Sequence, residues 1–471
     1  MEAISEVGIL SVIPIILTLI LAFITKDAVL SLVIGCIVGV VIAGFDPARG
    51  LSVLFQHALG NEDFIWVMMI EVAVGIMIAF YLKAGVVDAF TEVASKKIRS
   101  RRLASGFPWL LFVFTFFSDY FSPLFRGPIA RPITDKYNVS REMLAFILDS
   151  STASVCTIIP ISGWAVYIAG LLKGYGPIVT VDDGMNAFIR SIPYNFYGWL
   201  AFILCGLIAF QIIPNFGPMR KAEERALKEG KVIRDGATPL TGAELGEINV
   251  IEGKKTSLFV YLVIPVLIVI SIAVGTFLAL GSTKILEAFF VAVMYQAVAL
   301  TIGGFFKDIK DAMDTAYKGI KAVLPAIMIL ALAYSINDIS KALGAQKYII
   351  SITQSWMTPI MLPVATFLTG AIISFFTGTS WGTYAILFPF VMPLALLLSN
   401  NTVSPLVLVT IAAVVGGGCF GDHCSPVSDT TVLSSFGAAC DHIDHVITQS
   451  PYALTAAAIT AILYVIIGVI F

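Results

Sequence analysis

The chain consists of long apolar runs separated by shorter polar stretches. Several runs are long enough for a helix to cross the hydrocarbon core of a bilayer, which takes about 20 apolar residues. They cover residues 7–25, 28–45, 64–83, 193–213, 258–281, 286–306, 322–340 and 448–470. This pattern predicts an all-α polytopic membrane protein.

Four further apolar segments carry polar residues in their middle. Segments 141–172 and 405–436 are interrupted by Ser, Thr, Gly, Pro and Asp, which predicts two broken helices. Segments 104–136 and 357–398 are apolar at each end and polar between, which favours re-entrant hairpins that enter and leave on one side. With these hairpins the chain makes ten crossings.

Composition agrees with a membrane location for most of the chain. Hydrophobic residues make up 58% of the 471 positions and charged residues only 13%, whereas a soluble chain carries about 25% charged residues. The six cysteines are scattered and do not indicate a disulfide framework. No basic patch with interleaved aromatic residues suggests nucleic acid as a partner. The first run follows Glu2 and Glu6 and lacks a cleavage site, so we expect a retained helix.

The distribution of Lys and Arg predicts the orientation. Most of these residues lie in 84–106, 137–141, 214–257 and 307–321, all on one side of the ten-crossing topology. The other side holds Arg49, Lys173, Arg190, Lys284, Lys341 and Lys347. The positive-inside rule places the first set in the cytoplasm. We therefore expect a bacterial or archaeal cell (inner) membrane, with both termini outside.

The two halves of the chain resemble each other. Lys83-Ala84 and Lys341-Ala342 each end a span, 258 positions apart, and Asn138-Val139-Ser140 matches Thr402-Val403-Ser404 with a shift of 264. We expect a first repeat at 1–213, a cytoplasmic linker at 214–257 and a second repeat at 258–471. Because each repeat makes five crossings, the second must be inverted. Inverted repeats with broken helices are typical of secondary transporters.

The polar interruptions are the candidate site. Stretches 118–123, 149–154, 377–382 and 416–431 are expected to be unwound, and non-helical backbone at membrane depth survives only where protein or water satisfies it. Freed carbonyls with Ser, Thr and Asp oxygens suit a hard cation such as Na+. The same small polar residues can also serve helix packing.

Ionisable residues at this depth are functional candidates by default. The expected cation- and proton-binding residues are Asp119, Asp149, Asp422 and Asp429. The expected substrate-binding residues are Ser118, Ser122, Arg126, Ser150, Ser151, Thr152, Thr377, Thr379, Ser380, Ser425, Ser428 and Thr430. Glu71, in mid-span, is either functional or paired with an arginine. Arg126 and Arg131 either form such pairs or bind an organic carboxylate.

Two stretches resemble the NhaC family of sodium/proton antiporters. They are 127–141 with 149–153, and 421–431 continuing to Cys440-Asp441-His442. The resemblance implies Na+/H+ antiport by alternating access of the elevator type, two re-entrant hairpins, a homodimer, and Na+ and H+ as coupling ions without a cofactor. The alternative is Na+-coupled transport of an amino acid or a carboxylate such as malate or lactate. The first tip, Ser118-Asp119, carries one acidic residue where relatives carry two, which leaves room for this alternative.

Other chemistries fit less well. Cys419, His423, Cys424, Cys440, His442 and His445 match no closed zinc pattern, so Na+ is expected instead of zinc. Residues 441–445 are expected at the cytoplasmic surface, and His423 either relays protons or is hydrogen-bonded at a helix end. A hydrolase using Ser425 or Ser434 would lack a nucleophile elbow, and no Walker A loop indicates a pump. The chain is therefore predicted not to be an enzyme.

Overall fold

A computed structural model describes residues 7–25, 27–116, 119–160, 162–240, 248, 254–280, 284–353 and 360–470. All named elements in these ranges are helices. Seven are long and apolar enough to cross a membrane, or up to nine if each of two bent pairs is one span. The seven are α4 (Glu62–Lys83), η5 (Phe259–Val263) continued by α13 (Ile264–Leu280), α14 (Ile285–Ile302), α15 (Ile309–Ala342), α18 (Ser380–Leu398), α19 (Pro405–Asp422) and α21 (His442–Ile470). The prediction of an all-α polytopic membrane protein is confirmed.

The two bent pairs add a further helix at the end of a span that the sequence predicted as simple, 28–45 in one case and 193–213 in the other. Helix α2 (Ala28–Ile42) turns by 111° into α3 (Pro47–Leu59), which we did not expect. Helix α10 (Val181–Ser191) with η3 (Ile192–Tyr194) turns by 52° into α11 (Phe196–Ala209). Asp46 caps α3 by accepting a hydrogen bond from the Arg49 amide, and Pro47 follows at the first helical position, where its missing N–H costs nothing. Local capping chemistry therefore explains the extra helix.

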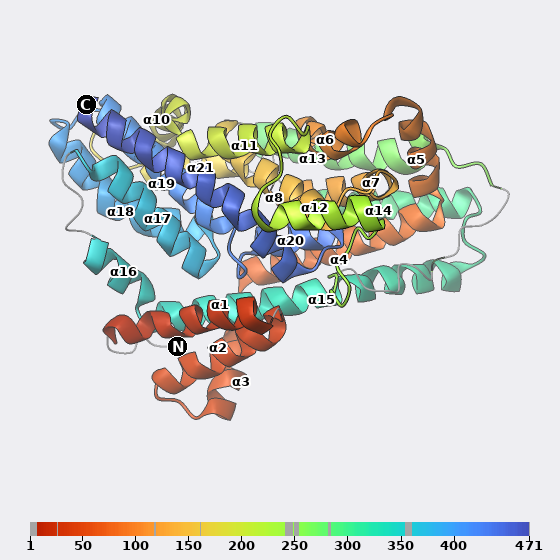
Figure 1. Ribbon diagram of the computed structural model, residues 1–471, viewed down its shortest axis with the longest axis horizontal. Helices are drawn as coiled ribbons and strands as arrows, with labels where there is room; N and C mark the ends of the chain where they lie inside the picture. Colours follow the sequence, from red (N-terminus) through yellow and green to blue (C-terminus); the bar gives the residue numbers. More distant parts are fainter. Residues whose placement is uncertain are drawn as a thin grey trace.

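One group of helices is built around the contact between α4 and α15. We call it the α4/α15 body; it comprises η1 (Gly8–Val12), α1 (Ile13–Thr25), α2, α3, α4, η5 and α13–α15. Two glycines let the helices touch, since a Cβ on Gly75 would lie 2.5 Å from the Gly319 carbonyl oxygen and the reverse distance is 2.4 Å. In Figure 1, α1–α3 lie together on one side of the long α15.

The second group, the hairpin body, carries the polar interruptions. It comprises α6 (Arg101–Leu110), η2 (Leu111–Phe114), α7 (Phe121–Lys136), α8 (Arg141–Ile158), α9 (Gly163–Leu172), α10, η3, α11, α17 (Leu362–Thr377), α18, α19, α20 (Asp429–Ala438) and α21. Helices α7, α8 and α20 pack on one another, and α19 packs on α17 and α18. Helices α5 (Val86–Lys97) and α16 (Ala345–Thr353) lie beyond the ends of α4 and α15. Figure 1 shows α8, α20 and α21 beside one another near the middle of the molecule.

Both expected hairpins are pairs of helices joined by a short connection. Helices α17 and α18 are separated only by Gly378 and Thr379. Gly378 adopts φ 65°, a left-handed conformation that glycine reaches at little cost, and a Cβ there would lie 2.3 Å from the Val427 carbonyl oxygen. The second tip is therefore pressed against the chain between α19 and α20. Whether either hairpin is re-entrant stays a prediction.

The two expected broken helices are each interrupted, but one break lies elsewhere. Helix α19 ends at Asp422 and α20 begins at Asp429, so only 423–428 of the expected stretch 416–431 lies outside a helix. Likewise, residues 121–123 belong to α7, and only Gly378 and Thr379 of 377–382 lie outside a helix. Helix α8, however, runs through Asp149 to Ser154 without a break and ends at Ile158. The expectation of unwound backbone at 149–154 is wrong. The Ser151 and Thr152 hydroxyls donate to the Ile147 and Leu148 carbonyls, so a polar run continues the helix.

The two broken helices share their local design. Helices α8 and α19 each contain 18 residues and begin 264 positions apart, at residues 141 and 405. Ser140 and Ser404 cap them, accepting hydrogen bonds from the Met143 and Val407 amides. An asparagine with positive φ precedes each cap, Asn138 at 53° and Asn401 at 57°. The match between the halves therefore extends from sequence to helix length and capping.

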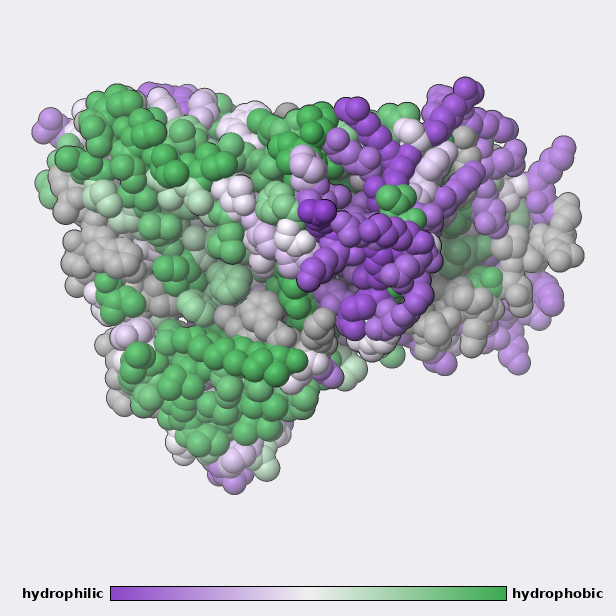
Figure 2. Space-filling view, in the orientation of Figure 1, coloured by the Kyte–Doolittle hydropathy of each residue, from purple (hydrophilic) through white to green (hydrophobic). Residues whose placement is uncertain are grey.

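The linker docks against the hairpin body through helix α12 (Gly217–Glu229). Glu223 accepts hydrogen bonds from the Ser140 amide at 2.8 Å and from Arg101 at 2.6 Å. Figure 2 shows hydrophilic residues gathered over α12 and towards the end of the molecule where α5 lies, with hydrophobic surface over α1 and α2. Hydrophobic surface over some helices suits contact with lipid, and the hydrophilic surface over α12 suits contact with water.

Candidate functional site

The second hairpin tip meets the second helix break at a buried aspartate. Asp422, the last residue of α19, is 2% exposed. Its carboxylate accepts hydrogen bonds from the hydroxyls of Ser380 at 2.8 Å and Ser428 at 2.7 Å. Ser428 also contacts Thr430 at 3.0 Å, and the Thr431 hydroxyl donates to the Asp422 carbonyl. Ser380, Ser428 and Thr430 thus lie around Asp422.

The first hairpin tip reaches the same break from the other half of the chain. Asp119 is buried and accepts a hydrogen bond from the Trp164 indole N–H at 3.0 Å. The Tyr120 hydroxyl donates to the Asp429 carboxylate at 2.8 Å. Ser118 lies outside the described residues. Residues more than 300 positions apart, one from each half of the chain, are therefore brought together.

Asp149 is held by the last helix instead of by an unwound segment. The Gln449 side-chain N–H2 donates to its carboxylate at 2.9 Å and also to the His423 carbonyl. His445 Nε2 lies 3.7 Å from the same carboxylate. Ser150, the next residue, approaches His423 Nδ1 at 3.4 Å, and the Tyr197 hydroxyl bonds the other ring nitrogen. Helices α8, α11 and α21 thus meet the break after α19.

The buried aspartates lie close enough together to form an acidic group. Asp429 is close enough to Asp119, Asp422 and Glu71 for the carboxylates to repel one another. In the described ranges, no lysine or arginine pairs with Asp119, Asp149 or Asp422. Buried unpaired charges are costly, and like charges at short range add to that cost. The arrangement therefore favours taking up protons or a cation.

Glu71 is the least satisfied member of this group. It is fully buried in α4, and neither carboxylate oxygen has a hydrogen-bond partner among the residues that the structure describes. The neighbouring aromatic contact between Trp66 and Tyr120, 5.3 Å between ring centroids, joins α4 to the first hairpin tip. Among the residues that the structure describes, no arginine pairs with Glu71. Glu71 lies instead where the two bodies meet.

Arg126 has a different environment from the one expected of a substrate ligand. Its terminal nitrogens donate to the hydroxyls of Ser151, at 2.8 Å, and Thr152, and to the carbonyls of Pro108 and Leu148. The Thr152 hydroxyl oxygen in turn lies 3.0 Å from the Ser122 hydroxyl. The fully buried guanidinium thus joins α7 to α8. Its role in substrate binding stays a prediction, as do those of Ser122, Ser151 and Thr152.

Three other expected ligands form hydrogen bonds between their hydroxyls and backbone groups. Thr377 donates to the Ile373 carbonyl at 2.8 Å, and Ser425 to the Phe375 carbonyl at 2.6 Å. Thr379 caps α18 by accepting a hydrogen bond from the Gly382 amide. These contacts shape the tip and the break. The sequence pattern did not identify Gln449, Trp164 or Tyr197; the polar Gln449 inside an apolar run, four residues after His445, was the available signal.

The histidines after α20 are not at the surface. His442 and His445 are 2% and 0% exposed, and both contact the Ser435 hydroxyl. The expectation of a surface position for residues 441–445 is wrong, because the linker covers them. The Thr238 amide donates to Asp441, and Arg234 pairs with Asp444 at 2.7 Å.

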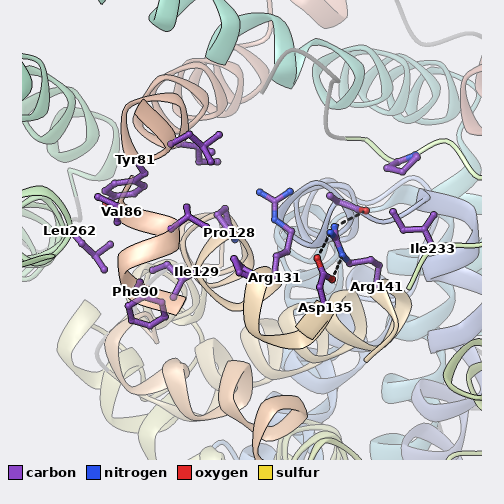
Figure 3. Close-up of a pocket in the computed structure, with 16 residues that line it drawn as sticks. Tyr81, Val86, Phe90, Pro128, Ile129, Arg131, Asp135, Arg141, Ile233 and Leu262 are labelled. Atoms are coloured by element: carbon purple, nitrogen blue, oxygen red, sulfur yellow. Dashed lines mark hydrogen bonds and ion pairs between the residues drawn. The ribbon is translucent and has the colours of Figure 1, made fainter. Parts of the chain in front are cut away.

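A cavity of about 560 Å³ opens between the two bodies on the linker side. Apolar residues of α4, α5 and α7 form most of its wall, with Ile233 and Pro239 of the linker at one edge. Figure 3 shows the Arg131 side chain pointing into the open space, next to the pair between Arg141 and Asp135. That pair is bidentate, with distances of 2.7 and 2.6 Å.

Comparisons with known proteins agree with these features. The model of the Na+/H+ antiporter family matches residues 155–469. An uncharacterised protein of Haemophilus influenzae is 32% identical over 97% of this chain and 90% of its own length. A malate-2H(+)/Na(+)-lactate antiporter of Bacillus subtilis is 31% identical over 44% of each chain. The Na(+)/H(+) antiporter NhaC of Alkalihalophilus pseudofirmus is 29% identical over 35% of this chain and 34% of its own.

Proposed function

The chain belongs to the Na+/H+ antiporter family, and from that premise we propose that it exchanges Na+ for H+ at the aspartates around Asp422. The observation that carries the proposal is the setting of Asp422: a buried carboxylate at a helix end, held by two hydroxyls and next to Asp119 and Asp429. Carboxylate and hydroxyl oxygens are ligands that hard cations prefer. The same carboxylates can take a proton when no cation is bound, which is the chemistry of antiport.

Asp422→Asn tests this proposal. Asparagine keeps the shape and can still contact Ser380 and Ser428, but it carries no charge and takes no proton. In proteoliposomes, we expect Na+-dependent proton movement to be lost while the protein still inserts and elutes as wild type. Asp182→Asn, on the exposed start of α10, is the matched control and should keep full activity. Wild-type exchange in Asp422→Asn would remove Asp422 from the mechanism.

The finer architecture belongs to the same proposal. We place α8–α9 and α19–α20 as equivalent broken helices of two inverted five-crossing repeats, supported by their equal length and capping at a shift of 264. The hairpin body then moves against the α4/α15 body in an elevator motion. Assembly as a homodimer in a cell membrane, with the linker in the cytoplasm, completes this proposal.

A cross-link between the two bodies tests the motion. Trp66 on α4 and Tyr120 at the first tip are in ring contact. Cysteines at both positions should be joined by a short bifunctional thiol reagent, and the exchange that the untreated double variant retains should stop. Each variant with one of the two cysteines, measured before and after the same reagent, is the control. Undiminished exchange by the cross-linked protein would contradict movement of one body past the other.

A second candidate function rests on the cavity. Its wall is largely apolar, and the Arg131 guanidinium points into it (Figure 3). A guanidinium over an apolar surface suits a small organic carboxylate. Na+-dependent uptake of radiolabelled lactate or malate, reduced in Arg131→Gln, would support this function. Na+-dependent proton movement that needs no organic solute, with no solute uptake, would exclude it.

A further inference from the structure

Two buried histidines share one serine near Asp149. Ser435, on α20, lies 3.0 Å from His442 Nδ1 and 2.8 Å from His445 Nδ1. His442 Nε2 lies 2.9 Å from the Pro426 carbonyl oxygen, and His445 Nε2 lies 3.1 Å from the Gln449 side-chain oxygen. His442, Ser435 and His445 are at most 2% exposed. We call these three residues the histidine array.

The outer partners determine where each ring carries a proton. The Pro426 carbonyl can only accept, so His442 Nε2 must donate to it. The Gln449 amide nitrogen already donates to Asp149 and to the His423 carbonyl, so its oxygen faces His445 and accepts from Nε2. Both rings therefore carry a proton on Nε2.

With this assignment, the two Nδ1 atoms that face Ser435 lack one proton between them. If both rings were neutral, both Nδ1 atoms would be acceptors and both would need the single Ser435 hydroxyl proton. The Thr431 carbonyl, 2.8 Å from the same hydroxyl, competes for it as a third acceptor. With one added proton both rings are satisfied, and the Thr431 carbonyl keeps its partner within the helix, the Ser435 amide. The charged ring then donates from Nδ1 to Ser435, and Ser435 donates to the neutral ring.

We propose that the histidine array binds one proton and exchanges it with Asp149. This inference rests on the proposed function, because it supplies the proton that the antiport step moves. The proton passes from His445 Nε2 to the Asp149 oxygen 3.7 Å away, after a small approach of the two side chains. The N–H bond breaks and an O–H bond forms. The imidazolium becomes a neutral ring that keeps its Nδ1 proton towards Ser435, and the carboxylate becomes a neutral acid. The Gln449 amide then turns over, so that its N–H2 donates to His445 Nε2 and its oxygen accepts from the protonated Asp149.

Burial opposes a positive charge on the histidine array, and the carboxylates around it offset part of that cost. The array lies towards the linker side of the molecule. The charged and titratable groups that face it are Asp149 on α8, Asp441 just before α21, Asp444 on α21, Arg234 of the linker, His423 after α19, and Cys440. Carboxylates outnumber cations among them. The Arg234 side chain is 32% exposed, so the array lies one layer beneath solvent. Water on that side returns the proton that Asp149 takes.

The first test separates proton transfer from Na+ binding. Reconstituted wild type, His445→Gln and His442→Gln are compared in two assays: Na+-driven proton movement, and exchange of radioactive Na+ for Na+ without a pH gradient. We expect the first to fall on the order of a hundredfold in both variants, as for the loss of a positioned proton-transfer group, and the second to stay within about twofold of wild type. His57→Gln, on exposed α3, is the control and should match wild type in both.

Unchanged proton movement in the histidine variants would overturn the inference, and so would equal loss of both reactions, which would indicate a structural role.

A second measurement does not depend on transport. The chain has four histidines, so nitrogen-15 histidine spectra of the full-length protein in lipid nanodiscs can be assigned with single variants. We expect one imidazolium shared by His442 and His445 near neutral pH, lost in Ser435→Ala. Two neutral rings across the pH range of activity would refute the array. An imidazolium in a protein without Na+-driven proton movement would instead refute the proposed function alone.

Discussion

Helices α7 and α20 approach so closely that a single methyl group should separate them. A Cβ on Gly127 would lie 2.2 Å from the Gly437 carbonyl oxygen and 2.3 Å from its carbonyl carbon. A Cβ on Gly437 would lie 2.4 Å from the Pro123 carbonyl oxygen. All these neighbours are backbone atoms, which cannot rotate away as a side chain can. Gly127→Ala must therefore push the two helices apart.

The size of the effect follows from the distances. Ordinary contact between a methyl carbon and an oxygen needs more than 3 Å, so the axes must move by about 1 Å, which is the kind of overpacking that costs about 1–3 kcal/mol. The intrinsic gain of alanine over glycine within a helix, about 1 kcal/mol, offsets part of this cost. Because the clash is with backbone atoms, we expect the upper part of this cost, about 2–3 kcal/mol, and therefore a net loss of about 1–2 kcal/mol in the free energy of unfolding. Helix α20 carries Asp429, and α7 begins directly after Tyr120. Moving the two helices apart should therefore also strain the hydrogen bond between the Tyr120 hydroxyl and the Asp429 carboxylate.

Gly170→Ala is the matched control, since a Cβ at Gly170 on α9 would have no atom within 4 Å. Unfolding of both variants is followed by circular dichroism in mixed micelles with increasing sodium dodecyl sulfate, and Na+-dependent proton movement is measured in proteoliposomes. Gly127→Ala should unfold at lower detergent fraction and lose activity, whereas Gly170→Ala should be as stable as wild type or slightly more so. Equal stability of the two variants would show that the α7–α20 contact is not tight.

Three further changes test contacts around the site. Tyr120→Phe removes the hydrogen bond to Asp429, and because a hydrogen bond to a charged group contributes about 1.5–3 kcal/mol, the Na+ concentration for half-maximal proton movement should rise about tenfold or more. Arg126→Lys replaces a guanidinium that reaches four acceptors by a compact ammonium, so the free energy of unfolding should fall by about 1–3 kcal/mol in the same detergent titration. Glu223→Ala breaks the 2.6 Å pair with Arg101 and should make the linker helix α12 accessible to trypsin; an unchanged digestion pattern would argue against docking of α12.

The apolar runs were sufficient to predict the class and most of the helices. Runs of about 20 apolar residues leave no other stable arrangement than membrane helices. Local chemistry explains the ends of several helices: Gly378 allows the left-handed turn at the second tip, and Ser404 caps α19. Asp422 was expected near a helix break because glycines, a proline and polar residues surround it, and it lies at one.

The first break and the pairing of the site residues depended on contacts between distant segments. Ser and Thr can donate to carbonyls four residues earlier, so the polar run after Asp149 is compatible with a helix, and only packing decides. The contact of Gln449 with Asp149 joins positions 300 apart, and that of Tyr120 with Asp429 joins positions 309 apart. No local pattern encodes such distances. The sequence by itself determined a membrane transporter with polar interruptions, and the tertiary structure decided which of those polar groups meet.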